Sequence, residues 1–237
     1  MDGVQAKTCA PFCVTLGAME IDDFLSRLVQ MIVPSHVFNQ YDFAHDANAI
    51  RRHNLRLYLA HMSERRPHIL LVGEAAGYRG CRLTGVPFTS PFIMRHGLDA
   101  VDLFGLSRGF QVSDEWPHIQ REASATIVWN TLSAGRALPL LWNAFPFHPF
   151  RPGEPQSNRT PVAGELRLGQ PFWQDLLQIY PVTTVIAVGN RANSALSPWF
   201  PQAGVAFRHV RHPAQGGKAD FVRGMQAVMA KANARRP

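Results

Sequence analysis

The stretch that decides the fold lies at positions 69–88 and reads ILLVGEAAGYRGCRLTGVPF. It begins with four consecutive apolar residues at 69–72, a pattern typical of a parallel strand that is covered on both faces. Gly73, Gly77 and Gly80 follow, and they predict a tight turn that leads from this strand into a helix. Their spacing matches neither the dinucleotide-binding fingerprint nor the phosphate-binding loop, so the turn indicates neither of those ligands.

Three further apolar runs resemble the first, and they lie at 138–142, 182–188 and 205–210. Between the runs, apolar residues recur at helical spacing near 55–62, 172–180 and 221–229, and a further helix is expected at 118–132 with Ser113 or Asp114 as its cap. Strands that alternate with helices predict an α/β fold, with three α/β/α layers around a central four-stranded, mainly parallel sheet. The segment rich in proline and glycine at 146–171 is expected to be a long loop within a single domain of residues 1–237.

The composition favours a folded, basic protein. Of the 237 residues 46% are hydrophobic, which excludes disorder over most of the length. The 24 Lys and Arg exceed the 17 Asp and Glu, giving a formal net charge of +7, so a polyanion is the first partner to consider. Three cysteines, Cys9, Cys13 and Cys81, are too few for a disulfide scaffold and predict a cytoplasmic location. No apolar run is long enough to cross a membrane, and we expect a monomer.

Three polar residues follow predicted strands. Glu74 follows the first strand, Asn143 the second and His212 the fourth. Because the carboxyl ends of parallel strands meet at one edge of a sheet, these side chains are expected to converge on a single pocket. Two of them also have a plainer interpretation, since a glutamate after a strand is commonly a helix N-terminal charge and a loop histidine is commonly solvated. Asn143 is more informative, because an amide buried at the end of an apolar strand needs partners or a ligand. His209 and His212 lack a third ligand at a convincing spacing, so no metal site is predicted, and the absence of a G-x-S-x-G motif argues against a serine hydrolase.

The same residues resemble a known family. The stretch 73–88, with its ending Thr84-Gly85-Val86-Pro87-Phe88, resembles motif A of the uracil-DNA glycosylase superfamily. The ending is similar to the single-strand-selective branch, and the opening Gly73-Glu74-Ala75 is similar to the iron–sulfur branch known as family 4. Asn143 matches the uracil-reading asparagine, the stretch 158–161 resembles family 4, and His212 with Pro213 matches the start of the C-terminal motif. The resemblance spans about residues 68–217 in one consistent order.

The sequence also departs from this family. Where family 4 has cluster cysteines, this chain has Phe147 or His148 and Gly169, and Cys9 and Cys13 lack the usual spacing, so we expect no iron–sulfur cluster and no other cofactor. Ala75 stands where several branches have a catalytic Asp or Asn, and Gly77 stands where some members have a tyrosine that excludes the thymine methyl group.

The resemblance implies an enzyme that removes uracil from uracil-containing DNA and leaves an abasic site. Its implied catalytic residues are Glu74, which orients or activates water, and His212, which donates a hydrogen bond to uracil O2. Asn143 would read the base and Phe88 would stack on it, within a base pocket that Gly73, Ala75 and Gly77 also line. Arg211, Gly216 and Lys218 are expected to meet the DNA backbone, with Arg79 and Arg82 as further candidates.

Three other functions stay open at this point. The chain could hold uracil-containing DNA without turning it over, and Ala75 and Ala76 keep that alternative alive. It could remove another base, such as hypoxanthine or thymine, which Gly77 favours. It could also be a cytosolic α/β enzyme whose positive charge has no connection with DNA.

Overall fold

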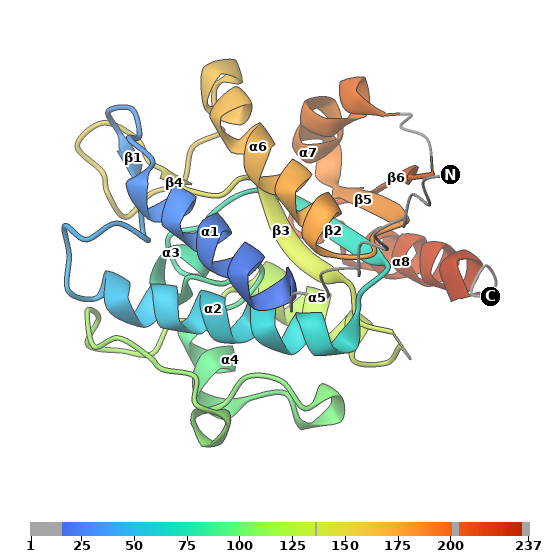
Figure 1. The fold of residues 1–237 in the computed structure, drawn as a ribbon, viewed down its shortest axis with the longest axis horizontal. Helices are drawn as coiled ribbons and strands as arrows, with labels where there is room; N and C mark the ends of the chain where they lie inside the picture. Colours follow the sequence, from blue (N-terminus) through green and yellow to red (C-terminus); the bar gives the residue numbers. More distant parts are fainter. Residues whose placement is uncertain (1–15, 136, 201–203, 234–237) are drawn as a thin grey trace, which may run out of the picture.

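The computed structural model describes residues 16–135, 137–200 and 204–233, and a parallel sheet of four strands forms its centre (Figure 1). The strands are β2 (Ile69–Ala75), β3 (Leu140–Phe145), β5 (Thr184–Val188) and β6 (Ala206–Val210). They lie in the order β3-β2-β5-β6, and every neighbouring pair is parallel. All six residues of β3 are buried, as a continuous apolar run predicts for a strand inside such a sheet.

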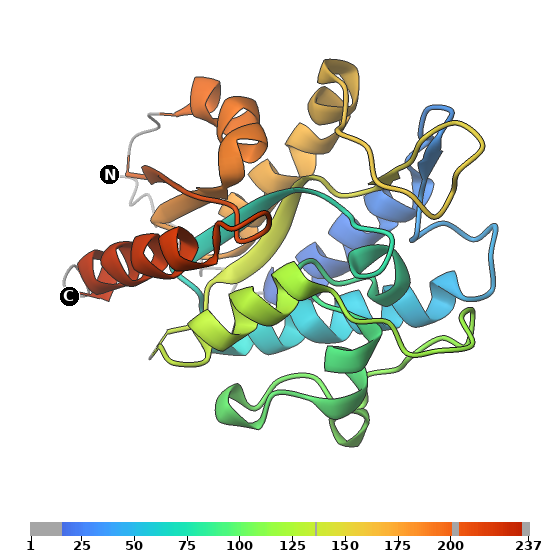
Figure 2. The same ribbon diagram turned by 180° about the vertical axis from the view of Figure 1, so that it is seen from behind.

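Helices cover both faces of the sheet. Figure 1 shows one face covered by α1 (Leu16–Gln30), α6 (Ala163–Ile179) and α7 (Gly189–Leu196). Figure 2 shows the opposite face covered by α5 (Ala123–Leu132) and α8 (Lys218–Asn233). The predicted three-layer α/β/α fold with a four-stranded sheet is therefore confirmed.

The edge strand β3 is closed by α2 (Asn48–Arg65). The Leu141 N–H donates to the hydroxyl of Tyr58 in this helix at 2.7 Å, which satisfies a backbone group that an open sheet edge would expose. On the α1 side, Phe24 packs edge-on against Trp142 of β3, with 5.2 Å between ring centroids.

The remaining elements are short. A two-stranded antiparallel pair joins β1 to β4, and the rest are brief helical turns. These elements are β1 (Val37–Phe38), β4 (His148–Pro149), α3 (Cys81–Thr84), α4 (Pro91–His96) and the 3₁₀ helices Asp99–Val101, Leu106–Arg108 and Ser197–Trp199.

Two predicted boundaries are wrong. The helix expected at 118–132 begins only at Ala123, with Glu122 rather than Ser113 or Asp114 at its N-cap. The preceding segment is drawn into tertiary contacts instead: the buried Arg51 pairs with Glu115, and the Phe92 N–H donates to the Gln120 carbonyl at 3.1 Å. These contacts outweigh the local helical periodicity.

The loop expected at 146–171 ends early, because α6 already begins at Ala163 and contains Pro171. Glu165 stabilises this start: its carboxylate accepts from the Val162 N–H at 2.9 Å and pairs with Arg159 at 2.6 Å. Gly169 permits the close packing that follows, since a Cβ there would overlap the Ala144 carbonyl of β3.

Candidate functional site

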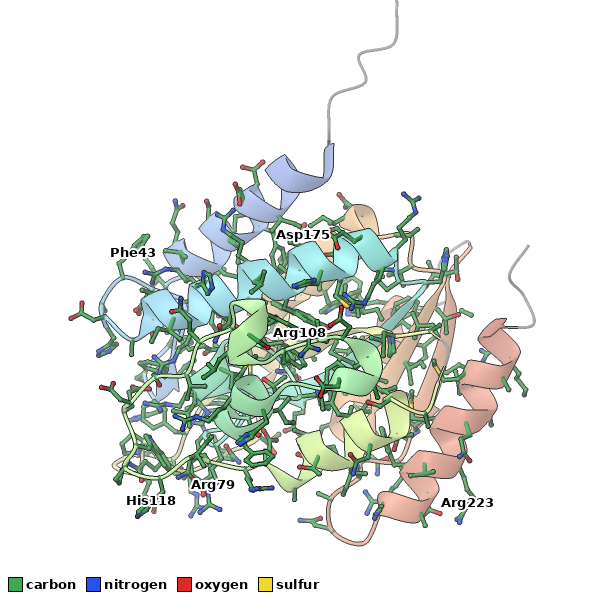
Figure 3. All side chains as sticks on the ribbon, turned by 90° about the horizontal axis from the view of Figure 1, so that it is seen from below. Phe43, Arg79, Arg108, His118, Asp175 and Arg223 are labelled. Atoms are coloured by element: carbon green, nitrogen blue, oxygen red, sulfur yellow. The ribbon has the colours of Figure 1, made fainter. Side chains whose placement is uncertain are left out.

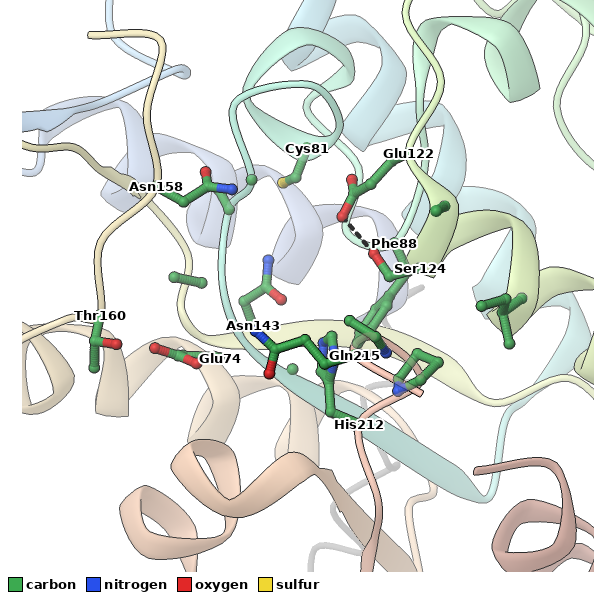
Figure 4. A pocket seen from close by; sticks show the side chains of 18 of the residues that line it. Glu74, Cys81, Phe88, Glu122, Ser124, Asn143, Asn158, Thr160, His212 and Gln215 are labelled. Atoms are coloured by element: carbon green, nitrogen blue, oxygen red, sulfur yellow. Dashed lines mark hydrogen bonds between the residues drawn. The ribbon is translucent and has the colours of Figure 1, made fainter. Parts of the chain in front are cut away.

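A cavity of about 740 Å³ opens at the carboxyl ends of the parallel strands (Figure 4). This is the edge at which open α/β sheets bind their ligands. The cavity is lined from the ends of β2 and β3, the start of α5, the loop before α6 and the loop between β6 and α8. The sequence-predicted residues that line it are Gly73, Glu74, Ala75, Gly77, Phe88, Asn143, His212, Gly216 and Lys218.

Asn143 lies inside β3 rather than after it, because the strand continues three residues beyond the predicted run, to Phe145. Strand register pairs it with Gly73 of β2. The residue is only 4% exposed, yet its carboxamide forms no hydrogen bond with any residue that the structure describes. A buried amide normally finds partners, so an unengaged one at a cavity wall indicates a group held for a ligand.

Phe88 has a backbone conformation that few non-glycine residues adopt, with φ at +53°. The indole N–H of Trp129 donates to the Phe88 carbonyl at 2.8 Å and holds this conformation in place. The ring then lies against Gly73, where a Cβ would come within 2.6 Å of Phe88 Cζ and 2.7 Å of Asn143 Oδ1. Gly73 therefore makes room for an aromatic face and an amide in the same corner of the cavity.

His212 presents one defined nitrogen to the cavity. The Ala214 N–H donates to His212 Nδ1 at 3.1 Å, so in the neutral ring the proton is on Nε2. Burial, and secondarily the charge of Arg211, lowers the pKa of His212 below its ordinary value of 6.5. A neutral imidazole with a free Nε2–H is a hydrogen-bond donor at neutral pH.

Glu74 lies at the end of β2 beside Thr160 (Figure 4). Burial raises the pKa of the Glu74 carboxyl above its ordinary value of 4.5, and the Thr160 hydroxyl and the charge of Arg191 partly offset that rise. Asn158 of the same loop accepts the Tyr78 N–H at 3.0 Å through its side-chain oxygen, which fixes the loop against the turn after β2. Asn158, Arg159 and Thr160 of this loop are therefore part of the cavity wall, which the sequence analysis did not predict.

Glu122 is a cavity residue that the sequence analysis missed. Its carboxyl Oε1 accepts from Ser124 Oγ at 2.7 Å, and a Cβ on Gly77 would lie 3.5 Å from the same oxygen. Burial raises the pKa of Glu122, with Ser124 as a partial offset. The sequence could have indicated Glu122 only through its position just before a helix. The predicted helix at 118–132 hid that position, because it placed Glu122 inside the helix rather than at its N-cap.

The predicted DNA-contacting residues fall into two groups. Gly216 and Lys218 line the cavity, while Arg211 is exposed beside His212 without lining it, and Arg79 lies exposed at the edge of the molecule in Figure 3. Arg82, unlike Arg79, is only partly exposed. Its guanidinium carbon lies 4.8 Å from the Phe38 ring centroid and its Nη2 lies 4.0 Å from Glu115, so an aromatic face and a carboxylate hold the side chain against the protein.

No group of three His, Cys, Asp or Glu in the described ranges could hold a metal ion. Cys9 and Cys13 lie outside those ranges, so the expected absence of a cluster stays a prediction. Cys81 is a buried free thiol beside Tyr41 and Gln40, and burial raises its pKa to about 12. A thiol with that pKa is a poor nucleophile. No helix in residues 16–135, 137–200 or 204–233 combines the length and apolarity that crossing a membrane requires.

Comparison with known proteins yields a match in structure but none in sequence. No protein-family model and no curated protein matches the chain. The crystal structure of wild-type SMUG2 from Pedobacter heparinus matches with a TM-score of 0.64 and 13% sequence identity, covering 91% of this chain and 98% of that one. SMUG2 belongs to the uracil-DNA glycosylase superfamily. The chain therefore shares the fold of SMUG2, which is the fold that its sequence resemblance implied.

Proposed function

We propose that this chain is a DNA glycosylase that hydrolyses the N-glycosidic bond of uracil in DNA and leaves an abasic site. The observation that carries the proposal is the unengaged Asn143 carboxamide, held in a buried corner between Gly73 and the Phe88 ring. The fold supports the same activity, since the matching SMUG2 structure comes from a superfamily of DNA glycosylases.

Recognition of uracil follows from the donor and acceptor pattern of an amide. Asn143 Oδ1 accepts from uracil N3–H while its NH₂ group donates to O4. Cytosine presents an acceptor at N3 and a donor at C4, so it meets mismatched groups at both positions. Phe88 supplies a flat face on which the extruded base stacks, a contact worth about 1–3 kcal/mol.

Hydrolysis breaks the bond between uracil N1 and sugar C1′. The bonding electron pair leaves with the base, and the negative charge that develops on O2 is stabilised by the Nε2–H of neutral His212. A water oxygen bonds to C1′, Glu74 accepts the proton that this water loses, and the released base gains a proton to become neutral uracil. The raised pKa of Glu74 makes its carboxylate a stronger base toward this water than an ordinary glutamate.

DNA binding is assigned to the rim of the cavity. Lys218 is the first residue of α8 and Gly216 precedes it in an open left-handed turn, with φ at +78° and no atom within 4 Å of a Cβ built there. Phosphates near the extruded nucleotide would meet Lys218, Arg211 and the open backbone at Gly216. One copy of the chain carries all of the described cavity residues, so we propose that the protein acts as a monomer. We also propose that it acts in the cytoplasm.

Single-turnover incubation with a labelled uracil-containing oligonucleotide, single-stranded and double-stranded, tests the proposal. Alkali converts abasic sites to strand breaks, and we expect breaks only at uracil. Intact DNA with a persistent uracil-specific gel shift would instead indicate a binding module. Breaks at hypoxanthine or thymine in preference to uracil would indicate a glycosylase for another base. If the assay shows no abasic product and no gel shift, a role at DNA is refuted.

A further inference from the structure

Glu122 occupies space that two glycines leave open. A Cβ on Gly80 would overlap Glu122 Oε2 and lie 2.9 Å from its Cδ, and a Cβ on Gly77 would lie 3.5 Å from Oε1. The carboxyl group therefore fills the side of the cavity where the turn after β2 has no side chains of its own. It reaches this position from the start of α5, a separate element of the fold.

The carboxyl group is held firmly in this position. Ser124, two residues further along the chain, donates to Oε1 at 2.7 Å. Ser124 is the one side chain in the described part of the chain that hydrogen-bonds to this carboxyl group. The contact points the carboxyl into the same cavity that Phe88, Asn143 and His212 line (Figure 4).

The position of Glu122 relative to a bound base follows from the geometry of the pyrimidine ring. In Figure 4, Glu122 and His212 lie on opposite sides of the cavity, with Asn143 and Phe88 between them. C5 of a pyrimidine lies directly across the ring from C2. A uracil stacked on Phe88, with O2 at His212 and its N3–O4 edge at Asn143, therefore turns C5 toward Glu122.

We propose that Glu122 is the residue that discriminates uracil from pyrimidines with a 5-methyl group. The inference rests on the proposed uracil glycosylase function and assigns the selectivity of that same pocket. A hydrogen at C5 fits beside the carboxyl group, whereas a methyl group would need the volume that this group fills. The methyl would also strip water from the carboxyl without supplying a hydrogen bond in return, which is unfavourable.

The test compares uracil with thymine in two assays on one set of variants. The first measures single-turnover cleavage of oligonucleotides with uracil or thymine opposite guanine. The second measures binding of matching oligonucleotides whose target sugar carries a 2′-fluorine, which resists cleavage. The variants are Glu122→Ala, Glu122→Gln and Ser124→Ala, and Glu64→Ala is the matched control because Glu64 is an exposed glutamate in α2. Thermal melting verifies that each variant is folded.

We expect Glu122→Ala to lower the ratio of uracil to thymine cleavage about tenfold or more. Discrimination of this size is typical when two substrates differ by one methyl group in a closely fitting pocket. Glu122→Gln has nearly the same volume and should retain most of the preference, and Glu64→Ala should retain all of it. Ser124→Ala frees the carboxyl group and should shift the preference in the same direction as Glu122→Ala, so it carries the test if the alanine variant fails to fold.

A folded Glu122→Ala variant with the wild-type preference would overturn the inference, as would a glutamine variant that loses as much preference as alanine does. Absence of cleavage by the wild-type protein would refute the proposed function but not this inference, because the binding assay still reads selectivity. In that case a uracil preference in binding that depends on Glu122 supports the inference, and equal binding of uracil and thymine by the wild type overturns it.

Discussion

Replacing Gly73 by alanine should disable the pocket while leaving the fold intact. The new Cβ would lie 2.6 Å from Phe88 Cζ and 2.7 Å from Asn143 Oδ1, whereas ordinary Cβ contacts begin at 3.4 Å. The ring must therefore retreat by 3.4 − 2.6 = 0.8 Å and the amide oxygen by 3.4 − 2.7 = 0.7 Å. Misplacement of binding groups by about 1 Å costs on the order of a hundredfold in rate, and we expect a loss of that size in single-turnover uracil cleavage.

The effect of this substitution on stability should be small. Overpacking of this kind costs about 1–3 kcal/mol, and the reduced freedom of the unfolded chain offsets about 0.4–1 kcal/mol of it. The net cost is then at most about 2.6 kcal/mol, so the melting temperature should fall by no more than about 10 °C.

Gly164→Ala is the matched control, because Gly164 lies in α6 away from the cavity and a Cβ there meets only the flexible end of Arg167 at 3.8 Å. Its cleavage rate should equal that of the wild type, and its melting temperature should be unchanged or slightly higher. The proposed base pocket is wrong if Gly73→Ala cleaves uracil within about threefold of the wild-type rate, since a 1 Å displacement should cost far more.

Four further predictions concern the polar groups of the cavity. Asn143→Asp should slow uracil cleavage about a hundredfold and admit cytosine, because a carboxylate can accept from the cytosine amino group; full uracil activity in a cleavage panel would show that Asn143 does not read the base. His212→Ala should slow the single-turnover rate about 100- to 1,000-fold with little change in DNA affinity, whereas weaker binding at an unchanged rate would assign His212 to DNA contact instead. The cleavage rate should fall in acid as Glu74 loses its basic form, and the fall should begin above the ordinary carboxyl value of 4.5 because the pKa of Glu74 is raised. The lowered pKa of His212 keeps its ring neutral to a pH below 6.5. A Glu74→Gln variant should be slow at every pH, and a wild-type rate in that variant would exclude Glu74 as the proton acceptor. Glu122→Gln should raise the melting temperature near neutral pH, because the raised pKa of Glu122 means that its ionised form is unfavourable in the folded state. The gain in melting temperature should fade as the pH falls and Glu122 becomes protonated, and a gain that is independent of pH would contradict this reasoning.

The sequence determined the elements of the sheet because a strand buried on both faces has a local signature. Each of the four apolar runs became a strand, and the predicted parallel sheet follows from their alternation with helices. Glu74, Asn143 and His212 could be foreseen at one edge for the same reason, since each is close to the carboxyl end of a strand and parallel strands share that edge.

Local patterns were weaker where long-range contacts competed with them. The periodicity at 118–132 predicts a longer helix than the one that forms, because Glu115 and Gln120 are held by Arg51 and Phe92, which are distant in sequence. A basic residue such as Arg82 in the turn after a strand is expected to be solvated or to contact DNA. In the structure its guanidinium instead contacts the Phe38 ring and lies near Glu115.

The sequence by itself therefore determined the α/β class, the strands and the convergence of Glu74, Asn143 and His212 on one edge of the sheet. Only the tertiary structure decided which atoms meet inside the cavity. The register of β2 on β3 places Gly73 beside Asn143, Trp129 holds Phe88 in a left-handed conformation, and the start of α5 brings Glu122 over two glycines of another element. The physical reason is that hydrophobic periodicity acts over a few neighbouring residues, whereas the contacts that shape a pocket join residues that only folding brings together.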